Sequence, residues 1–338
     1  MSLCKFFCLF TVAVVCHSML AHADEVSSGF IIGADISWVQ QQEAEGKTWS
    51  DDGEQKDIFA ILRDHGFNWI RLRIFVDPRA EGGYSKEGYC DLKHTLQMAK
   101  RVKAAGMRLL INFHYSDTWA DPAHQRKPAA WADLHGADLE QAVHDHTREV
   151  MAALEKQGTT PDMVQVGNEI SHGMLWPDGK VWDNKDWEGF CGLIKAGIAA
   201  VHESDPTVQT MIHLASGGQN AKSRGFLDRV LEQDVDFDIL GQSYYPQWHG
   251  TLDDLKSNLS DLAKRYEQPI IVVEYSVPNI REINDIVSGL PNGKGLGTFI
   301  WEPTKWRGGA LFDQEGKTKP EIDVYREMVE DHGQNRAR

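Results

Sequence analysis

Short runs of apolar and β-branched residues recur along the chain, and each is followed by a longer stretch with apolar residues every three or four positions. Such runs are typical of buried strands, and such stretches are typical of amphipathic helices. The expected strands are 31–36, 69–75, 107–113, 163–166, 208–214, 237–240, 269–273 and 296–301. The expected helices are 54–65, 91–105, 138–157, 187–203, 222–232, 252–266, 280–290 and 321–330.

Glycines mark the ends of the first three expected helices, at Gly66, Gly106 and Gly158, and a strand follows almost at once. Eight strand–helix alternations within about 300 residues predict an α/β fold, a single (β/α)8 TIM barrel. A doubly wound sheet is the alternative, but it requires a glycine-rich phosphate fingerprint after its first strand. The sequence there, Gly-Ala-Asp-Ile-Ser at 33–37, does not match that fingerprint.

The first 23 residues are predicted to be a secretory signal peptide rather than part of the fold. Lys5 provides a short positive start, residues 6–20 are apolar, and Ala21-His22-Ala23 matches a cleavage pattern. A buried first helix is the alternative interpretation. We therefore expect a secreted protein, extracellular or periplasmic, with one folded domain at 24–330 and a polar tail at 331–338.

The net charge of the chain limits the classes of partner that it is expected to bind. The chain has 35 Lys and Arg against 50 Asp and Glu, a formal net charge of −15, and no basic block. Nucleic acid and anionic membranes are therefore not expected as partners, and the oligomeric state is left open.

After residue 23 only two cysteines remain, Cys90 and Cys191. We expect two buried or half-buried thiols, with a disulfide between them as the alternative.

The tryptophans are concentrated where a barrel places its ligands. All of the 11 tryptophans except Trp69 and Trp187 lie at the carboxyl ends of the expected strands or in the loops after them. Barrel active sites are built at that end. Flat indole rings that stack on the C–H faces of sugars would explain the concentration, and loop packing is the alternative for about half of them.

Two of the expected strands lead into a glutamate. Asn168 and Glu169 follow the strand at 163–166, and Glu274 follows the strand at 269–273. A carboxylate at the end of a buried strand is costly unless it serves a purpose. Two opposed carboxyl groups, one a protonated acid and the other an ionised nucleophile or base, are what glycoside hydrolysis requires. Solvated glutamates at the loop edges are the alternative.

With these glutamates in place, the sequence resembles glycoside hydrolase family 53, the arabinogalactan endo-β-1,4-galactanases, within the clan of retaining (β/α)8 glycosidases. The resemblance covers nearly all of the chain after the signal segment. Its most specific motif is Asn-Phe-His-Tyr-Ser-Asp-Thr-Trp-Ala-Asp-Pro at 112–122. Further matching segments are 33–37, 56–59, 68–73, 77–78, 165–170, 243–246 and 301–303.

The resemblance implies catalytic roles for the two glutamates. Glu169 would be the acid/base and Glu274 the nucleophile of a double displacement. Asn168 would bind the sugar 2-hydroxyl group. Arg71 would point inward together with Arg73 and keep Glu274 ionised, whereas a purely structural ion-pair network is the alternative for both arginines.

Substrate-binding roles are implied for residues of the surrounding loops. His114 would bind the nucleophile or the sugar, with a satisfied core histidine as the alternative. Either Tyr244 or Tyr245 would donate to Glu274, and we favour Tyr244. Trp301 would form the floor under the sugar at the cleaved bond.

Three further residues stand near these motifs. Asp117 and Trp119 would shape neighbouring subsites, with loop packing as the alternative. Glu302 is a third carboxylate, a rival to the nucleophile, but it precedes Pro303 and extends no buried strand. We interpret Glu302 as structural.

No cofactor and no metal are expected. Many members of the family carry acidic calcium ligands in a long loop after the strand of the nucleophile, but here Pro278 leads almost directly into the expected helix. We expect the loops after the last two strands to be short. The predicted function is endo-acting, retaining hydrolysis of β-1,4-galactosidic bonds in galactan or type I arabinogalactan. A related β-glycanase such as a mannanase, or a non-catalytic sugar-binding barrel, are the alternatives.

Overall fold

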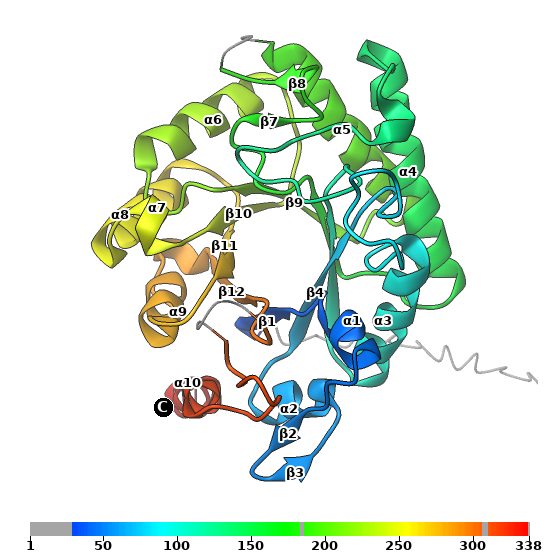
Figure 1. Ribbon diagram of the computed structural model, residues 1–338. Helices are drawn as coiled ribbons and strands as arrows, with labels where there is room; N and C mark the ends of the chain where they lie inside the picture. The colour runs from blue at the N-terminus through cyan, green and yellow to red at the C-terminus, as the bar shows by residue number, and fades with distance from the viewer. Residues whose placement is uncertain (1–28, 183–185, 306–309, 337–338) are drawn as a thin grey trace, which may run out of the picture.

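The computed structural model describes residues 29–182, 186–305 and 310–336. The predicted signal peptide at 1–23 lies outside the described residues. Eight parallel strands form a closed barrel, and helices surround it (Figure 1). The predicted (β/α)8 barrel is therefore confirmed.

The barrel strands follow the expected runs closely, because each run is buried on both faces. Around the barrel each strand pairs with the next in chain order, and the last closes on the first. The strands are β1 (Ile31–Asp35), β4 (Trp69–Ile74), β5 (Arg108–Phe113), β6 (Met163–Val166), β9 (Gln209–Leu214), β10 (Ile239–Ser243), β11 (Ile270–Tyr275) and β12 (Gly295–Trp301).

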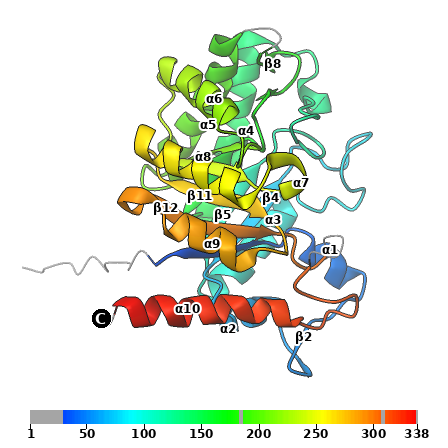
Figure 2. The same ribbon diagram turned by 90° about the vertical axis from the view of Figure 1, so that its left-hand side faces the viewer.

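The outer helices also follow the expected periodicity, and each turns its apolar face to the barrel. They are α2 (Ile58–Asp64), α3 (Leu92–Ala104), α4 (Gly136–Lys156), α5 (Trp187–Ser204), α6 (Asn220–Glu232), α8 (Leu252–Arg265), α9 (Ile280–Ser288) and α10 (Asp323–Arg336). Figure 2 shows α10 beside α2, where the ring of Tyr325 packs 4.4 Å from that of Phe67. The helix α10 continues to Arg336, inside the segment predicted as a polar tail.

Two local expectations were wrong. The helix expected at 54–65 begins later, because β2 (Ser50–Asp51) and β3 (Glu54–Gln55) form a hairpin and the Asp57 side chain caps α2 by accepting from the Phe59 amide. The loop after β12 is long, since the next element is η3 (Pro320–Ile322). Its described residues pair back onto the hairpin through the bridge between Ser50 and Lys317.

Smaller elements occupy the loops at the carboxyl ends of the strands. They are α1 (Val39–Ala44), η1 (Ala129–Trp131), the hairpin of β7 (Gly173–Met174) and β8 (Gly179–Lys180), and α7 (Pro246–His249). On the opposite end, η2 (Pro291–Gly293) leads into β12. The loops that carry added structure therefore lie on the side where the site is expected.

The interior of the barrel is filled with side chains and is not a channel. A cluster that includes Trp69, Met211 and Phe299 occupies it. Gly33 makes this packing possible, because a Cβ atom at that position would lie 2.2 Å from Cδ1 of Phe299. Any side chain at position 33 would therefore displace the phenyl ring from the barrel core.

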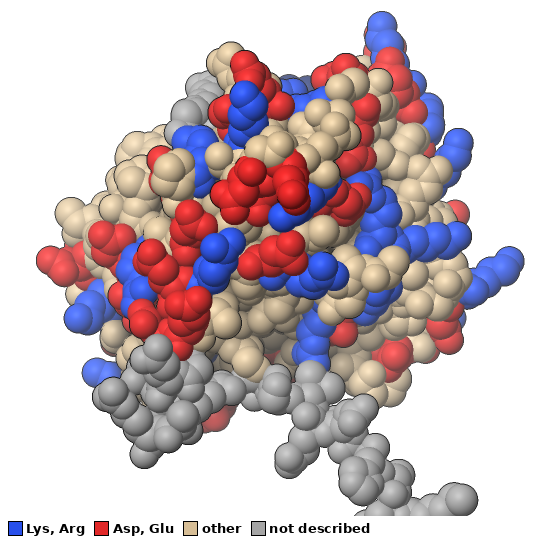
Figure 3. All heavy atoms as spheres, turned by 90° about the horizontal axis from the view of Figure 1, so that it is seen from below, with Lys and Arg blue, Asp and Glu red and all other residues tan. Residues whose placement is uncertain are grey.

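The state of the two cysteines and the distribution of surface charge agree with what the sequence predicted. Cys90 and Cys191 are both buried and unbridged, which confirms the expected thiols. Acidic and basic side chains are interspersed on the face seen in Figure 3 rather than separated into one basic surface. Within residues 29–182, 186–305 and 310–336, no helix is long and apolar enough to cross a membrane.

Candidate active site

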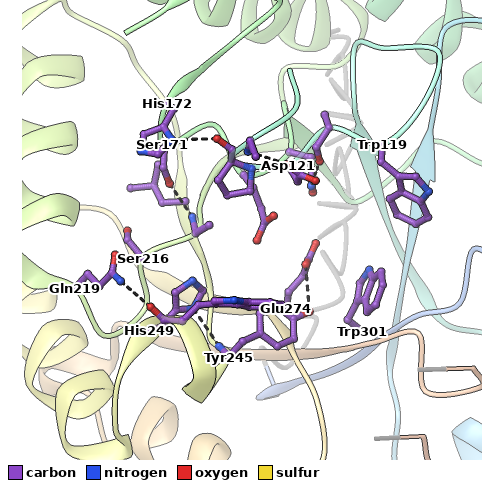
Figure 4. A pocket seen from close by; sticks show the side chains of 18 of the residues that line it. Trp119, Asp121, Ser171, His172, Ser216, Gln219, Tyr245, His249, Glu274 and Trp301 are labelled. Atoms are coloured by element: carbon purple, nitrogen blue, oxygen red, sulfur yellow. Dashed lines mark hydrogen bonds between the residues drawn. The ribbon is translucent and has the colours of Figure 1, made fainter. Parts of the chain in front are cut away.

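A cleft of about 1010 Å³ opens at the carboxyl ends of the barrel strands. Glu169 and Glu274 both line it, from β6 and β11 on opposite sides of the barrel. Figure 4 shows the side chain of Glu274 directed into this space, with Trp119 and Trp301 to one side. The structure thus brings together the two glutamates that the sequence singled out.

Glu274 is held by a cation and a phenol. Arg71 Nη1 donates to its Oε1 at 2.8 Å, and Tyr245 Oη donates to its Oε2 at 3.3 Å. Burial raises the pKa of Glu274, and the Arg71 guanidinium and these hydrogen bonds oppose that increase. The ionised form of Glu274 is therefore the one that its direct neighbours stabilise.

Glu169 has the opposite electrostatic surroundings. It is half-buried and accepts from Ser243 Oγ at 2.7 Å through Oε1. Desolvation and the negative charge of Glu274 raise the pKa of Glu169 to about 8. Because the two carboxyl groups are coupled and only Glu274 has a direct ion pair with Arg71, the proton of the pair belongs on Glu169.

The backbone at Glu169 is unusual. Its φ of 48° lies in the left-handed region, which few residues other than glycine adopt. Gly167 shortly before it also has a positive φ of 83°, and a Cβ atom there would meet Ile170 at 2.6 Å. The turn therefore needs glycine at 167, and it directs Glu169 into the cleft from the end of a strand.

Arg71 is the centre of a fully buried network. Besides Glu274, it donates to Asp35 Oδ2 at 2.9 Å, to Gln165 Oε1 at 3.0 Å and to Asn168 Oδ1 at 2.8 Å. Asn168 Nδ2 then donates to the backbone oxygen of Ala120 at 2.8 Å. Arg71 therefore fixes the nucleophile candidate and the neighbour of the acid candidate at the same time.

Arg73 bonds to carboxylates other than Glu274, contrary to expectation. It lies on the same face of β4 as Arg71 but one pleat further on, where it meets Glu302 Oε1 at 2.5 Å and Asp35 Oδ1 at 3.5 Å. Its guanidinium also lies 4.3 Å from the centre of the Trp119 ring. Glu302 is buried, lies outside the cleft lining and accepts from the Trp38 amide, in keeping with the structural role proposed for it.

The choice of Tyr244 over Tyr245 was wrong. Tyr244 Oη donates to the backbone oxygen of Gly250 at 3.0 Å, away from Glu274. The reason is the alternation of side chains along β10: Ile239 and Ser243 face the barrel interior, whereas Gln242 bonds to Ser223 on α6. The same alternation places Tyr245 in the site and Tyr244 outside it.

His114 lines the cleft, but its hydrogen bonds go to nearby residues of the same strand and the loop after it rather than to Glu274. Its Nδ1 accepts from the Ala120 amide at 3.0 Å, and Nε2 lies 3.2 Å from Asn112 Nδ2. Burial and the charges of Arg73 and Arg71 lower the pKa of His114 well below its usual value. His114 is therefore a neutral side chain in the cleft wall.

Asp117 does not itself line the cleft. Its carboxylate accepts from the backbone amides of Asp77 at 3.0 Å and of Ala129 at 2.7 Å. These bonds join two loops, as in the alternative of loop packing.

Trp119 and Trp301 line the cleft together with Trp38. Their ring centres lie 5.4 to 6.0 Å apart, and the planes are inclined to one another. Trp182 and Trp248 line another part of the cleft, and Trp248 is 61% exposed. Three other loop tryptophans do not line it: Trp49 and Trp131 are buried in the core, and Trp176 lies under Lys180. Trp306 lies outside the described residues.

Several lining residues were missed. Asp121 belongs to the motif at 112–122, Ser171 and Gln219 lie in loops after barrel strands, and Lys222 and His249 lie on the helices α6 and α7. Their place after a strand was the available signal, but polar loop residues are too common for it to select them.

Within the described ranges, no group of three or more His, Cys, Asp or Glu side chains could hold a metal ion. We predict that EDTA leaves both the melting temperature and the activity nearly unchanged, because a structural calcium site needs several oxygen ligands placed together. Thermal melts and initial rates with EDTA, before and after added calcium, check this. A loss of stability that calcium restores would contradict it.

A parallel barrel with a glutamate at the end of its fourth strand, another at the end of its seventh and tryptophans in the same cleft defines a glycoside hydrolase. Residues 31–285 match the sequence profile of Glycosyl hydrolase family 53. The chain belongs to this family.

Individual relatives agree with the assignment. An endo-β-1,4-galactanase of Bacillus subtilis is 32% identical over 310 residues, which cover 82% of this chain and 71% of that protein. An uncharacterized protein in the bgaB 5′ region of Niallia circulans is 42% identical over 312 residues, covering 81% and 83%. The solved GH53 catalytic domain of Ignisphaera aggregans superposes with a TM-score of 0.81 at 34% identity and covers 90% of this chain and 97% of that one.

Proposed function

We propose that the protein is a secreted endo-β-1,4-galactanase that cleaves galactan or type I arabinogalactan by double displacement. The observation that carries the mechanism is the asymmetry of the two carboxyl groups. Glu274 is paired with Arg71, whereas Glu169 faces Glu274 without a direct cation and has its pKa raised to about 8. The assignment of galactan is supported by the family and by the Bacillus subtilis relative.

In the first step, a carboxylate oxygen of Glu274 attacks the anomeric carbon, and Glu169 gives its proton to the leaving oxygen. Arg71 and Tyr245 hold the attacking carboxylate in place. In the second step, Glu169 takes a proton from water, which displaces Glu274 from the anomeric carbon. Asn168, oriented by Arg71, would bind the sugar 2-hydroxyl group.

The tryptophans around the cleft suit a polymeric substrate. Trp38, Trp119 and Trp301 lie on one part of the cleft, and Trp182 and Trp248 lie on another. Aromatic faces along the cleft would stack on several sugars of one chain, as an endo-acting enzyme requires. Secretion rests on the segment at 1–23, whose pattern is that of a signal peptide.

The function is tested by incubating the purified protein with β-1,4-galactan, mannan, xylan and cellulose and sizing the products. We expect galactan alone to be degraded rapidly, with a fall in mean chain length before monosaccharide accumulates. Faster release of sugars from mannan would contradict the substrate assignment. Absence of cleavage on all four polymers, with binding to one of them, would indicate a sugar-binding barrel.

The pKa of Glu169 predicts the alkaline limb of the pH profile. The acid must be protonated when the substrate binds, so kcat/KM should fall as the pH rises through about 8. Initial rates at low galactan concentration between pH 4 and 10 measure this limb, with melting curves at each pH to exclude unfolding. A profile that falls off well below neutral pH would mean that Glu169 is not the acid.

A further inference from the structure

A series of buried hydrogen bonds leads to Glu169 from β9 and β10. Ser243, the last residue of β10, has its Oγ 2.7 Å from Glu169 Oε1. His213 on β9 has its Nε2 2.8 Å from the same Ser243 Oγ. Both His213 and Ser243 are fully buried, so solvent does not compete for these contacts.

The donor and the acceptor in each of these hydrogen bonds can be assigned from neighbouring groups that can only donate. Arg71 donates through Nε and Nη2 to one oxygen of Gln165, its Oε1, which fixes the orientation of the Gln165 amide. Gln165 Nε2 lies 3.1 Å from His213 Nδ1, but its two hydrogens have closer acceptors in Asn112 Oδ1 at 2.6 Å and the backbone oxygen of Gly167 at 2.9 Å. The backbone N–H of Glu169 donates to His213 Nδ1 at 3.3 Å.

Because a backbone N–H can only donate, the bond from Glu169 makes His213 Nδ1 an acceptor, although Asn168 Oδ1 also lies 3.2 Å away. That oxygen already accepts from Arg71 at 2.8 Å and from Asn112 Nδ2 at 3.0 Å. The ring is neutral, because burial and the charge of Arg71 lower the pKa of His213 well below its usual value. A neutral ring with an acceptor Nδ1 carries its hydrogen on Nε2.

His213 Nε2–H then donates to Ser243 Oγ, and the Ser243 hydroxyl hydrogen is left to donate to Glu169 Oε1. In a protonated carboxyl group the carbonyl oxygen accepts hydrogen bonds much better than the hydroxyl oxygen, so the oxygen that accepts from Ser243 is the one without the hydrogen. The acid hydrogen of Glu169 is therefore placed on Oε2.

We propose that His213 and Ser243 are positioning residues that fix the transferable proton of Glu169 on Oε2 and stabilise the carboxylate left after its transfer. This inference rests on the proposed role of Glu169 as the acid/base. It gives one residue of β9 and one residue of β10 a role in catalysis, in addition to the two glutamates. Neither residue needs to touch the substrate, because both act through Glu169.

Other charged and titratable groups also surround Glu169, so its titration reflects several strands at once. Those that face it come from β4, the loop after β5, the end of β10 and β11: Arg71, Asp121, Tyr245 and Glu274. Those that act on His213 are Arg71, His114 and His249. Removing only the Ser243 hydroxyl leaves all of these in place, so a change in the pH profile reports on that hydrogen bond.

The test compares Ser243→Ala with a matched control, Ser223→Ala. Ser223 is also fully buried and hydrogen-bonded, at 2.9 Å to Ser216 Oγ, but it lies on α6 and outside the cleft lining. Both variants lose one buried hydroxyl group, so their melting temperatures should fall by similar amounts. Only Ser243→Ala should change the acid.

For Ser243→Ala we expect the alkaline limb of kcat/KM to move up by about one pH unit, because a hydrogen bond to the ionised carboxylate is lost. We expect kcat on aryl galactobiosides with poor leaving groups to fall about 10- to 100-fold. With 2,4-dinitrophenolate, which needs no protonation, the loss should be within about threefold. If kcat falls equally for both leaving groups and the alkaline limb of kcat/KM does not move, Ser243 has only a packing role.

Glu169→Ala, measured in the same series, separates this inference from the proposed function. If Glu169→Ala shows the dependence on leaving group and Ser243→Ala does not, the positioning role fails and the acid assignment stands. If neither variant shows it, the acid assignment fails as well.

A second measurement needs no activity. The ¹⁵N spectrum of imidazole-labelled wild-type protein, with His213→Gln to assign the signal, should show a neutral His213 with hydrogen on Nε2 from pH 5 to 8. A ring that titrates in this range, or that carries its hydrogen on Nδ1, would overturn the inference even if Ser243→Ala loses activity.

Discussion

Replacing Glu274 with alanine should lower kcat on galactan by about 10⁴-fold or more, because no other group can form the covalent intermediate. Its carboxylate lies in the cleft and is held by Arg71 and Tyr245. The loss should persist on 2,4-dinitrophenyl galactobioside, whose leaving group needs no acid. Initial rates on this substrate and on galactan measure the effect.

Azide should restore cleavage of the dinitrophenyl substrate by Glu274→Ala and should yield the α-galactosyl azide. The anion would occupy the space of the removed carboxylate and attack once, which inverts the anomeric centre. The wild type should release the β anomer first, as NMR of the nascent product can show. An α product from the wild type would mean inversion, and Glu274 would then be a base rather than a nucleophile.

Perturbed pKa values alone would not have identified the acid. Burial raises the pKa of Glu302 to about 8, as in Glu169. Glu302, however, is fully buried against Arg73 and lies outside the cleft, where no sugar oxygen can reach it. Placement at the cleft surface, and not the size of the shift, distinguishes the reacting carboxyl group from the structural one.

The barrel and the glutamate pair could be predicted because both depend on local patterns. Buried parallel strands are continuous apolar runs, and a barrel places the residue after each run at one end. The loops carried weaker signals. The hairpin before α2 and the long segment after β12 have little apolar periodicity, so a helix was extended too early and a loop was expected to be short.

The contacts that failed to be predicted join residues far apart in the sequence. Arg73 and Glu302 are separated by 229 positions, and Ser243 and Glu169 by 74. The choice between Tyr244 and Tyr245 depended on which residues of β10 face inward, and the contacts of Ser243 with Glu169 and of Gln242 with Ser223 settle this. His213, a polar residue inside an apolar run, was the one visible sign of the network behind Glu169.

Replacing Glu169 with alanine should remove the acid while leaving the nucleophile in place, and the two chemical steps should respond differently. On galactan, whose leaving group needs protonation, we expect kcat to fall about 10²- to 10⁴-fold. On 2,4-dinitrophenyl galactobioside the glycosyl-enzyme should still form, and its hydrolysis should become slow because no base activates water.

The glycosyl-enzyme of Glu169→Ala should therefore accumulate, which a burst of dinitrophenolate and the intact mass of the protein can reveal. Azide needs no base and should enter the space left by the Glu169 side chain, so it should accelerate turnover on the dinitrophenyl substrate. Two successive displacements would give the β-galactosyl azide, the opposite anomer to that expected from Glu274→Ala. This difference assigns each glutamate independently of how large its rate loss is. An α-azide from Glu169→Ala, or near-normal turnover of galactan by this variant, would remove Glu169 from the role of acid/base.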